Sequence, residues 1–392
     1  MINYSSNIWK LNAIKVLRWF LLFMPVIIPF FMGNGLSMEQ VMILQSIMAV
    51  SIVVMEVPSG YVGDVLGRKS SLIIGCTFGF LGFAVMSFAH TFWQFAITEF
   101  LLGIGASFVS GSDSAMLYDS LLANNREKEF VKYQGRLSSL GNFSESAAGI
   151  LGGLLAALSI RYPIYLQTFL LFFSILIAFS LKEPKRLKLS AADTKKNMKR
   201  IGEFLKNHPK VKWWLLFGGI VGAGTLTTAW VTQYYFKALE IDIKWFGFLW
   251  TAVNLTVGIG SYFSHKIRIF VPINVLMLVA LIIVMLAPAA AGYVFSLWGI
   301  GFFFAVYFMR GIVEPIFTDY INRYTASEMR ATVLSVRSFI FRALFAIFGP
   351  YVGWLLDRIS IGEALFLSLM MLFILGIGAY VMLKQVNAFV AD

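Results

Sequence analysis

The amino-acid sequence predicts an all-α membrane protein with twelve transmembrane helices in two pseudo-symmetric six-helix bundles. Three observations predict this fold: an apolar composition, regularly spaced apolar runs, and an internal repeat. Hydrophobic residues make up 59% of the 392 residues and charged residues only 13%, about half the ~25% typical of soluble proteins. Since so few charges cannot cover a water-soluble fold, a soluble enzyme, a nucleic-acid-binding protein and a disordered regulator are excluded.

The apolar runs give the number of spans and their orientation. A transmembrane helix needs about 20 mostly apolar residues. Basic residues concentrate in segments that lie in the cytosol when the N-terminus is placed there, which is the positive-inside pattern. The net charge of +12 therefore reports orientation, and we expect both termini in the cytosol and the chain in the cytoplasmic membrane. The predicted spans are 10–32, 38–62, 70–89, 92–122, 132–158, 162–181, 213–236, 244–264, 269–290, 292–322, 330–356 and 360–384.

One long hydrophilic segment, residues 182–212, separates the first six spans from the last six. Within it, Met198, Ile201 and Leu205 recur at helical spacing among lysines. This pattern fits either an amphipathic helix on the inner leaflet or a solvated linker helix. The expected domains are an N-terminal bundle over 1–181, a cytosolic linker over 182–212 and a C-terminal bundle over 213–392.

The two halves share residues at a fixed offset of 200 positions. The matches fall in three helix pairs with one register, which indicates duplication. Two related halves with a site near the middle of the membrane are a recurrent transporter architecture. The matching pairs are Gly60/Gly260, Arg68/Arg268, Gly111/Gly311, Asp119/Asp319, Gly149/Gly349 and Gly153/Gly353.

A motif after the second span reads GYVGDVLGRK. Gly60 can let another helix approach closely, Gly67 can form a tight turn, and Asp64 can pair with Arg68. A turn that is basic only because it lies on the cytosolic side would account for Arg68 and Lys69 but not for Asp64. The motif resembles the GxxxDxxGRK signature of the major facilitator superfamily, and the resemblance implies a cytosolic gate that clasps the halves together in the outward-facing state. The gate motif comprises Gly60, Asp64, Gly67, Arg68 and Lys69.

The resemblance covers the whole chain: six plus six spans, a long central loop, and a degenerate second motif copy from Gly260 to Arg268 in which Ser264 replaces the aspartate. It implies that spans 1, 4, 7 and 10 line a central cavity. Many members carry an arginine in helix 4 where this chain has Glu99.

Ionisable side chains within spans are costly and usually face a bundle interior or a water-filled cavity. Their spacing by three or four residues marks the polar face of spans 1, 4, 5 and 10, and span 7 offers hydroxyl groups instead. The candidates for the substrate or ion pathway are Arg18, Glu99, Asp113, Glu145, Tyr307, Arg310, Glu314, Thr225, Thr228 and Asn254.

Span 10 carries the pair that we expect to be central. Arg310 and Glu314 are one turn apart and can pair. Arg337 and Arg342 in span 11 are five residues apart, so we expect at most one of them to face the cavity. Buried ion pairs can also simply hold helices together or act as gates. The possible gate or pathway residues are Glu56, Asp119, Asp319, Arg337 and Arg342.

These features predict a secondary active transporter working by alternating access. The chain has no GxxxxGK[ST] loop for ATP, so an ion gradient or the substrate gradient must drive transport. A carboxylate beside an arginine in a low-dielectric cavity suits proton coupling, and Glu314 fits best. The abundance of Phe and Met favours drug or metabolite efflux by antiport, whereas the intramembrane arginines admit an organic anion, such as a carboxylate metabolite or siderophore, in either direction.

A different class of function is a non-transporting sensor or lipid-handling protein on the same fold. An enzyme is not expected, since no nucleophile-base pair and no metal-ligand spacing occurs. The expected partners are a small-molecule substrate, a coupling proton and the lipid bilayer; no nucleic acid, metal or cofactor is expected, and the chain is expected to be a monomer.

Overall fold

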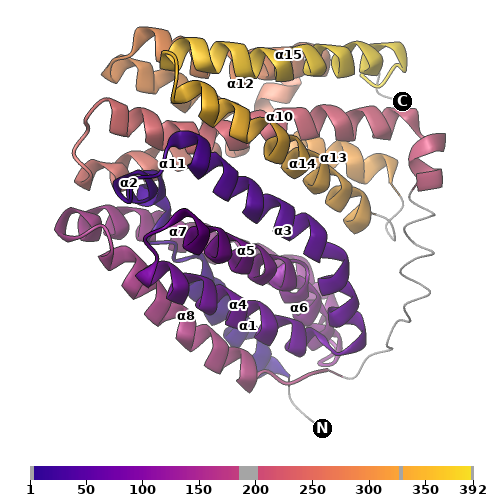
Figure 1. Ribbon diagram of the computed structural model, residues 1–392. Helices are drawn as coiled ribbons and strands as arrows, with labels where there is room; N and C mark the ends of the chain where they lie inside the picture. Colours follow the sequence, from indigo (N-terminus) through magenta and orange to yellow (C-terminus); the bar gives the residue numbers. More distant parts are fainter. Residues whose placement is uncertain (1–3, 185–201, 326–329, 390–392) are drawn as a thin grey trace. The chain divides into compact units, whose positions relative to one another are not determined.

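The computed structural model describes residues 4–184, 202–325 and 330–389, which form helices and no strands (Figure 1). The helices of the first half are α1 (Ser5–Trp19), η1 (Met24–Val26), α2 (Ile27–Gly33), α3 (Met38–Val65), α4 (Arg68–Phe88), α5 (Phe92–Val109), α6 (Ser112–Leu122), η2 (Glu127–Glu129), α7 (Phe130–Leu158) and α8 (Tyr162–Ser180). Those of the second half are α10 (Pro209–Ala238), α11 (Lys244–Phe270), α12 (Ile273–Val294), η3 (Leu297–Gly299), α13 (Ile300–Tyr324), α14 (Arg330–Leu356) and α15 (Ile361–Gln385). Each predicted span has a counterpart among them.

Two of the predicted spans are interrupted. The first is divided into α1, η1 and α2, and the fourth is divided into α5 and α6 at Gly111, whose φ of +74° suits glycine. A break inside a membrane frees backbone groups that need polar partners. At the first break, the N–H of Leu22 donates to Oε1 of the buried Gln167, 3.0 Å away.

Eleven segments of the described chain are long and apolar enough to cross a membrane. The remaining predicted span, the fifth (132–158), corresponds to α7, which has 29 residues. It carries Lys132, Arg136 and Glu145 and is not among the segments apolar enough to cross a membrane.

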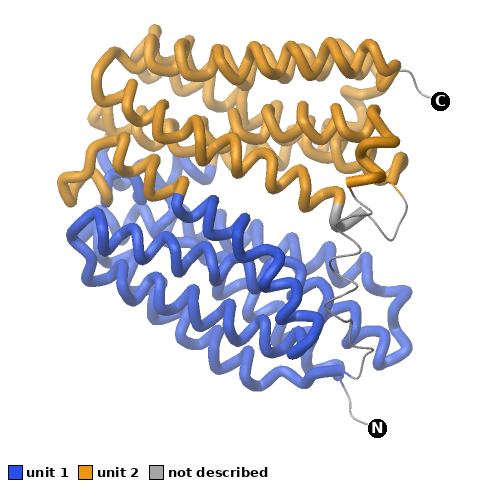
Figure 2. The backbone as a smooth tube through the Cα atoms, turned by 45° about the vertical axis from the view of Figure 1, so that its right-hand side comes forward, with its two compact units in different colours: residues 1–30, 47–195, 242–251 blue, residues 31–46, 196–241, 252–392 orange. Residues whose placement is uncertain are grey.

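The chain forms two compact units (Figure 2). Unit 1 contains residues 1–30, 47–195 and 242–251, and unit 2 contains residues 31–46, 196–241 and 252–392. The start of α3 thus belongs with the second half and the start of α11 with the first. The predicted linker helix lies mostly outside the described residues; residues 202–207, which include Leu205, are helical.

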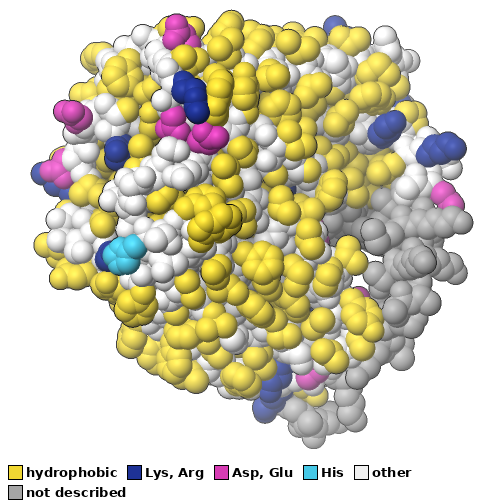
Figure 3. All heavy atoms as spheres, viewed as in Figure 1, with side chains coloured by type: hydrophobic (Ala, Val, Ile, Leu, Met, Phe, Trp, Pro, Cys, Tyr) yellow, Lys and Arg dark blue, Asp and Glu magenta, His cyan; other side chains and the backbone are white. Residues whose placement is uncertain are grey.

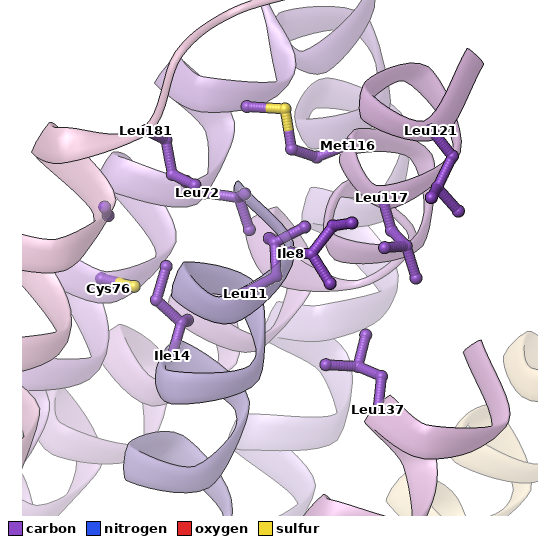
Figure 4. Close-up of a cluster of buried hydrophobic side chains, with 11 residues drawn as sticks. Ile8, Leu11, Ile14, Leu72, Cys76, Met116, Leu117, Leu121, Leu137 and Leu181 are labelled. Atoms are coloured by element: carbon purple, nitrogen blue, oxygen red, sulfur yellow. The ribbon is translucent and has the colours of Figure 1, made fainter. Parts of the chain in front are cut away.

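Apolar side chains fill the interior of each unit. In unit 1, side chains from α1, α4, α6, α7 and α8 meet in one cluster that includes Leu11, Leu72 and Met116 (Figure 4). In unit 2, Trp214 of α10 packs edge-on against Phe317 of α13, with ring centroids 5.2 Å apart. Because lipid is as apolar as these side chains, close packing stabilises such interiors more than the removal of water.

The surface is also apolar. Figure 3 shows hydrophobic side chains across most of one face of the molecule. Large side chains such as Phe88, Trp93 and Phe270 are 77%, 75% and 83% exposed. A soluble monomer rarely exposes contiguous apolar patches of this kind, so this is the surface of a multi-pass membrane protein.

Candidate functional site

Unit 2 contains a cavity of about 610 Å³ between α10, α11, α13 and α14. Its wall combines cations, one carboxylate, hydroxyl groups and apolar side chains. The polar lining residues are Thr225, Arg310, Glu314, Thr318, Arg337, Ser338 and Arg342, and the apolar ones include Val221, Leu226, Val257, Val313, Phe317, Leu334 and Phe341.

A two-pronged ion pair crosses this cavity wall from α13 to α14. The Arg337 guanidinium donates Nη1–H to Glu314 Oε1 at 3.0 Å and Nη2–H to Glu314 Oε2 at 2.5 Å. It also lies over the ring of Phe317, 5.2 Å from the centroid. Paired, planar hydrogen bonds of this type are stronger than single neutral ones.

The predicted pairing of Glu314 with Arg310 is therefore wrong. Arg310 precedes Glu314 on the helix, which is the weaker order for a pair four residues apart. Arg337 comes from another helix and can present both of its Nη groups in the carboxylate plane. The prediction that at most one of Arg337 and Arg342 faces the cavity is also wrong, because both line it. Long arginine side chains can reach around a helix from positions on different faces.

Arg310 remains available within the cavity. It is exposed, and within the described part of the chain its guanidinium has no ion-pair or hydrogen-bond partner. Arg342 donates its Nε–H to Ser338 Oγ at 3.3 Å and lies over the ring of Phe341, 5.0 Å from the centroid. The lining has three arginines and one glutamate, so the cavity carries an excess of positive charge.

The other second-half candidates differ in their access to this cavity. Thr225 lines it, although its hydroxyl already donates to Gly222 O at 2.8 Å. Thr228 is buried and donates to Gly224 O at 2.8 Å. Tyr307 is buried and Asn254 half-buried, and neither belongs to the lining.

In unit 1, Arg18 binds backbone rather than facing a described cavity. Its Nη1 donates to Gly75 O on α4 at 2.8 Å, and its Nη2 donates to Gly105 O on α5 at 3.4 Å. A Cβ atom at Gly79 would lie 3.3 Å from the same guanidinium. Arg18 therefore joins α1 to two neighbouring helices through room that glycines leave.

The remaining first-half candidates also lie in unit 1. Asp113 is in the first turn of α6, where a carboxylate is favourable, and pairs with Lys15 at 3.5 Å. Glu99 on α5 is 1% exposed, and Glu145 on α7 is half-buried. These three residues belong to unit 1, whereas the cavity described above is formed by unit 2 alone.

The signature motif forms a closed charge network at the start of α4. Asp64 pairs with Arg68 at 2.7 Å, and Gly67 has the expected positive φ, +121°. The Glu183 carboxylate accepts from the backbone N–H groups of Arg68 and Lys69 at 2.9 and 2.7 Å, which satisfies the helix N-terminus. The sequence analysis did not identify Glu183. The only feature of the sequence that marks this residue is its position as a carboxylate at the start of the basic linker.

Three further expectations concern the motif and the possible gate residues. Nothing described lies within 4 Å of a Cβ atom built at Gly60, so the expected close approach is not found there. Asp319 pairs with Arg323 at 2.9 Å on an exposed face. Glu56 and Asp119 are half-buried in α3 and α6.

A second helix terminus is also satisfied by a carboxylate that the sequence did not mark. Asp357, after α14, accepts from the backbone N–H groups of Met38 and Glu39 at 2.9 and 2.8 Å. Arg358 pairs with Glu39 at 3.3 Å. All four residues belong to unit 2. The available signal was the opposite charge of two loops on the predicted outer side.

The fold and the charged cavity define the class of protein: a multi-pass helical membrane protein with a solute-sized, polar recess. Residues 16–350 match the Major Facilitator Superfamily, and the chain belongs to this superfamily. Its members are transporters rather than enzymes. No curated protein matches the chain by sequence.

Solved structures agree with this assignment. The nucleoside transporter NupG is similar with a TM-score of 0.75 at 13% identity, over 96% of this chain and 99% of that one. The peptide transporter POT in complex with sulfate gives 0.74 at 11%, over 99% and 96%. A bacterial homolog of the human lysosomal transporter Spinster, inward-facing and occupied, gives 0.71 at 15%, over 99% and 97%. At these identities the likeness shows the fold, and it confirms the predicted twelve-helix class.

Proposed function

We propose that this chain is a secondary transporter that moves a small amphipathic organic anion together with a proton by alternating access. The observation that carries the proposal is the unit 2 cavity, where three arginines face one glutamate and Arg310 has no partner among the described residues. An arginine that is exposed in a cavity and has no described partner is free to bind an anion. A substrate carboxylate can accept its paired hydrogen bonds.

The cavity can bind both ends of such a substrate. Its volume of about 610 Å³ lies within the range of ~300–1,000 Å³ typical of small-molecule sites. Arg310 and Arg342 can hold a carboxylate through paired hydrogen bonds, and the Thr225 oxygen can accept a hydrogen bond from the substrate. Phe317 and Phe341 offer an apolar wall to the remainder of the molecule.

The ion pair between Glu314 and Arg337 supplies a coupling mechanism. While Glu314 is ionised, it occupies both Nη groups of Arg337. Protonation of Glu314 removes its charge and frees Arg337 for the substrate anion. Binding of a proton and binding of an anion then favour each other, which is the requirement for symport. This geometry supports symport of an anion over the efflux antiport that composition alone favours.

The charge networks at the two ends of α3 are suited to act as gates. α3 has 28 residues and is about 42 Å long at 1.5 Å per residue. The Asp357 cap lies at its first residues, and the pair of Asp64 and Arg68 lies at its end. In this proposal residues 1–181 and 213–392 move as two bodies joined by 182–212, and the two networks open alternately. Both termini are assigned to the cytosol, so the Asp357 network is the outer gate.

The test is flux into proteoliposomes that hold the purified protein, with labelled organic anions, cations and neutral solutes supplied under an inward acid gradient. We expect accumulation of an anion that collapses with a protonophore. Glu314→Gln should abolish gradient-driven accumulation while preserving exchange of the same anion, because the neutral amide leaves Arg337 available. Arg136→Gln, which removes an exposed cation from α7, is the matched control and should behave as the natural chain.

Three outcomes would contradict the proposal. Accumulation of cations or neutral solutes but not anions would exclude the substrate class. Unchanged gradient-driven flux in the Glu314→Gln variant would exclude the coupling residue. Absence of flux for every solute, with correctly folded protein, would favour the sensor or lipid-handling class.

A further inference from the structure

The two copies of the signature motif differ in their charge balance. In the first copy, the Asp64 carboxylate neutralises Arg68, and the Glu183 carboxylate satisfies the start of α4. In the second copy, Ser264 stands in place of the aspartate, and its hydroxyl donates to Ser261 O within its own helix at 2.7 Å. Arg268, the counterpart of Arg68, has no ion-pair or hydrogen-bond partner in the described ranges.

Among the described residues, no carboxylate takes the place that Glu183 has in the first copy. Glu183 follows α8, the last helix of the first half. The chain after α15, the last helix of the second half, approaches the second motif copy through Ala388 and Phe389. Neither residue has a charged side chain. Within the described residues, the second copy therefore keeps the cation of the motif but has no counterpart of Asp64 or of Glu183.

A pocket of about 370 Å³ lies at this place, between the ends of α11, α12 and α13. Its cationic and titratable groups are Arg268, His265 and Arg323, and its one carboxylate, Asp319, pairs with Arg323 at 2.9 Å. Arg268 is thus a lining cation with which no described carboxylate pairs. The pocket has the charge and the size for a phosphate group.

The surroundings of the pocket are those of the membrane interface. Tyr320 and Tyr324 form one wall, with ring centroids 4.5 Å apart, and tyrosine is enriched at the level of lipid head groups. Ile269 on the rim is 66% exposed, and the adjacent Phe270 is 83% exposed. A ligand in the pocket could therefore keep its phosphate beside Arg268 and its acyl chains against apolar surface.

We propose that this pocket binds the phosphate group of an anionic phospholipid, with Arg268 as the main ligand and His265 as a second. The lipid phosphate supplies the negative charge that Asp64 supplies in the first copy. Basic pockets between helix ends on the cytosolic side are the usual sites for acidic lipid head groups. This site lies on different residues from the cavity that contains Arg310, so it is independent of the proposed transport function.

Thermal unfolding of the detergent-purified chain tests the proposal, because a ligand that binds only the folded form raises the melting temperature. Phosphatidylglycerol should raise it, and phosphatidylcholine should not. Arg268→Gln should weaken the apparent affinity for phosphatidylglycerol at least about tenfold. Lys266→Gln, which removes the same charge from an exposed position two residues away, should leave it unchanged.

A second variant keeps the test valid if Arg268→Gln fails to fold. Ser264→Asp restores the carboxylate of the first motif copy, and it should raise the melting temperature of the lipid-free protein while weakening the lipid effect. Glycerol phosphate and inorganic phosphate form a further arm. Stabilisation by these soluble anions alone, sensitive to Arg268→Gln, would identify a free phosphate compound as the source of the group. Equal stabilisation by both lipids, or an unchanged phosphatidylglycerol effect in both variants, would overturn the proposal.

Discussion

Arg18 in unit 1 and Arg310 in unit 2 have the same side chain within predicted spans and opposite surroundings. Arg18 donates to the carbonyl groups of Gly75 and Gly105. Arg310 lines a cavity and has no such acceptor in the described residues. The depth of an arginine in a span therefore does not determine its role.

The difference lies in what surrounds each guanidinium. Gly75 and Gly105 let α4 and α5 pack backbone against backbone, and Gly79 leaves room for the Arg18 guanidinium, because a Cβ atom there would lie 3.3 Å from it. The cavity around Arg310 is lined by Gly218 and Gly222 as well as by larger side chains such as Val313 and Phe317, and no described lining group accepts a hydrogen bond from Arg310. A guanidinium whose N–H groups donate to backbone carbonyl groups has a structural role. A guanidinium that lines a cavity without such acceptors remains available to bind a ligand.

The largest expected effect is on substrate binding by Arg310→Gln. Loss of paired hydrogen bonds to a carboxylate, each worth about 1.5–3 kcal/mol when charged, should lower substrate affinity on the order of 100-fold. The melting temperature without substrate should not fall, since no described partner is lost. Equilibrium binding and thermal unfolding of the same preparation measure both quantities, and a large loss of stability would contradict the contrast with Arg18.

Arg18→Gln should give the reverse pattern. Two charged hydrogen bonds to backbone carbonyls are lost, at least one of which costs about 1.5–3 kcal/mol. We expect a lower melting temperature and a substrate affinity within about twofold of the natural chain for the protein that remains folded. A normal melting temperature with impaired binding would place Arg18 in the pathway instead.

Gly60 and Gly260 occupy equivalent positions of the repeat, and we expect substitution by alanine to affect stability differently in the two halves. A Cβ atom at Gly260 would collide with the backbone oxygen of Phe308, so Gly260→Ala must shift α11 from α13. Such overpacking costs about 1–3 kcal/mol. At Gly60 nothing described lies within 4 Å, so Gly60→Ala should be neutral or slightly stabilising. Denaturant unfolding measures the free energy of unfolding of both variants. An equal decrease in the two variants would contradict this difference.

The smallest expected effect concerns an ion pair between Asp242, in the loop before α11, and Lys244, the first residue of α11. Hydrogen bonds from the Lys244 side chain and backbone hold the pKa of Asp242 below its ordinary value. A depressed carboxyl pKa stabilises the fold above the unfolded-state pKa, and that stabilisation is lost as pH falls through the folded-state pKa. Asp242→Asn should lower the melting temperature slightly at pH 7 and not at all below the folded-state pKa. Both side chains are about half exposed, so a large shift at pH 7 would contradict the assignment.

The sequence predicted the helices well because hydropathy and helix length are local properties. All twelve spans have counterparts, and the motif turn at Gly67 adopts the expected positive φ. Partners between helices were not predictable in this way. Glu314 pairs with Arg337 on another helix instead of with its neighbour Arg310, and Asp357 caps a helix that begins more than 300 residues earlier. Such contacts depend on how the helices pack against one another. Their partners have no characteristic separation along the sequence, so a single sequence does not reveal them.

The anion site is tested most directly by comparing a carboxylate solute with its uncharged carboxamide of the same shape. We expect that a transported carboxylate raises the melting temperature of the natural chain and of Arg136→Gln, that its carboxamide does not, and that Arg310→Gln abolishes the carboxylate effect. Equal stabilisation by the acid and the amide, or a carboxylate effect that survives Arg310→Gln, would contradict an anion site in the unit 2 cavity.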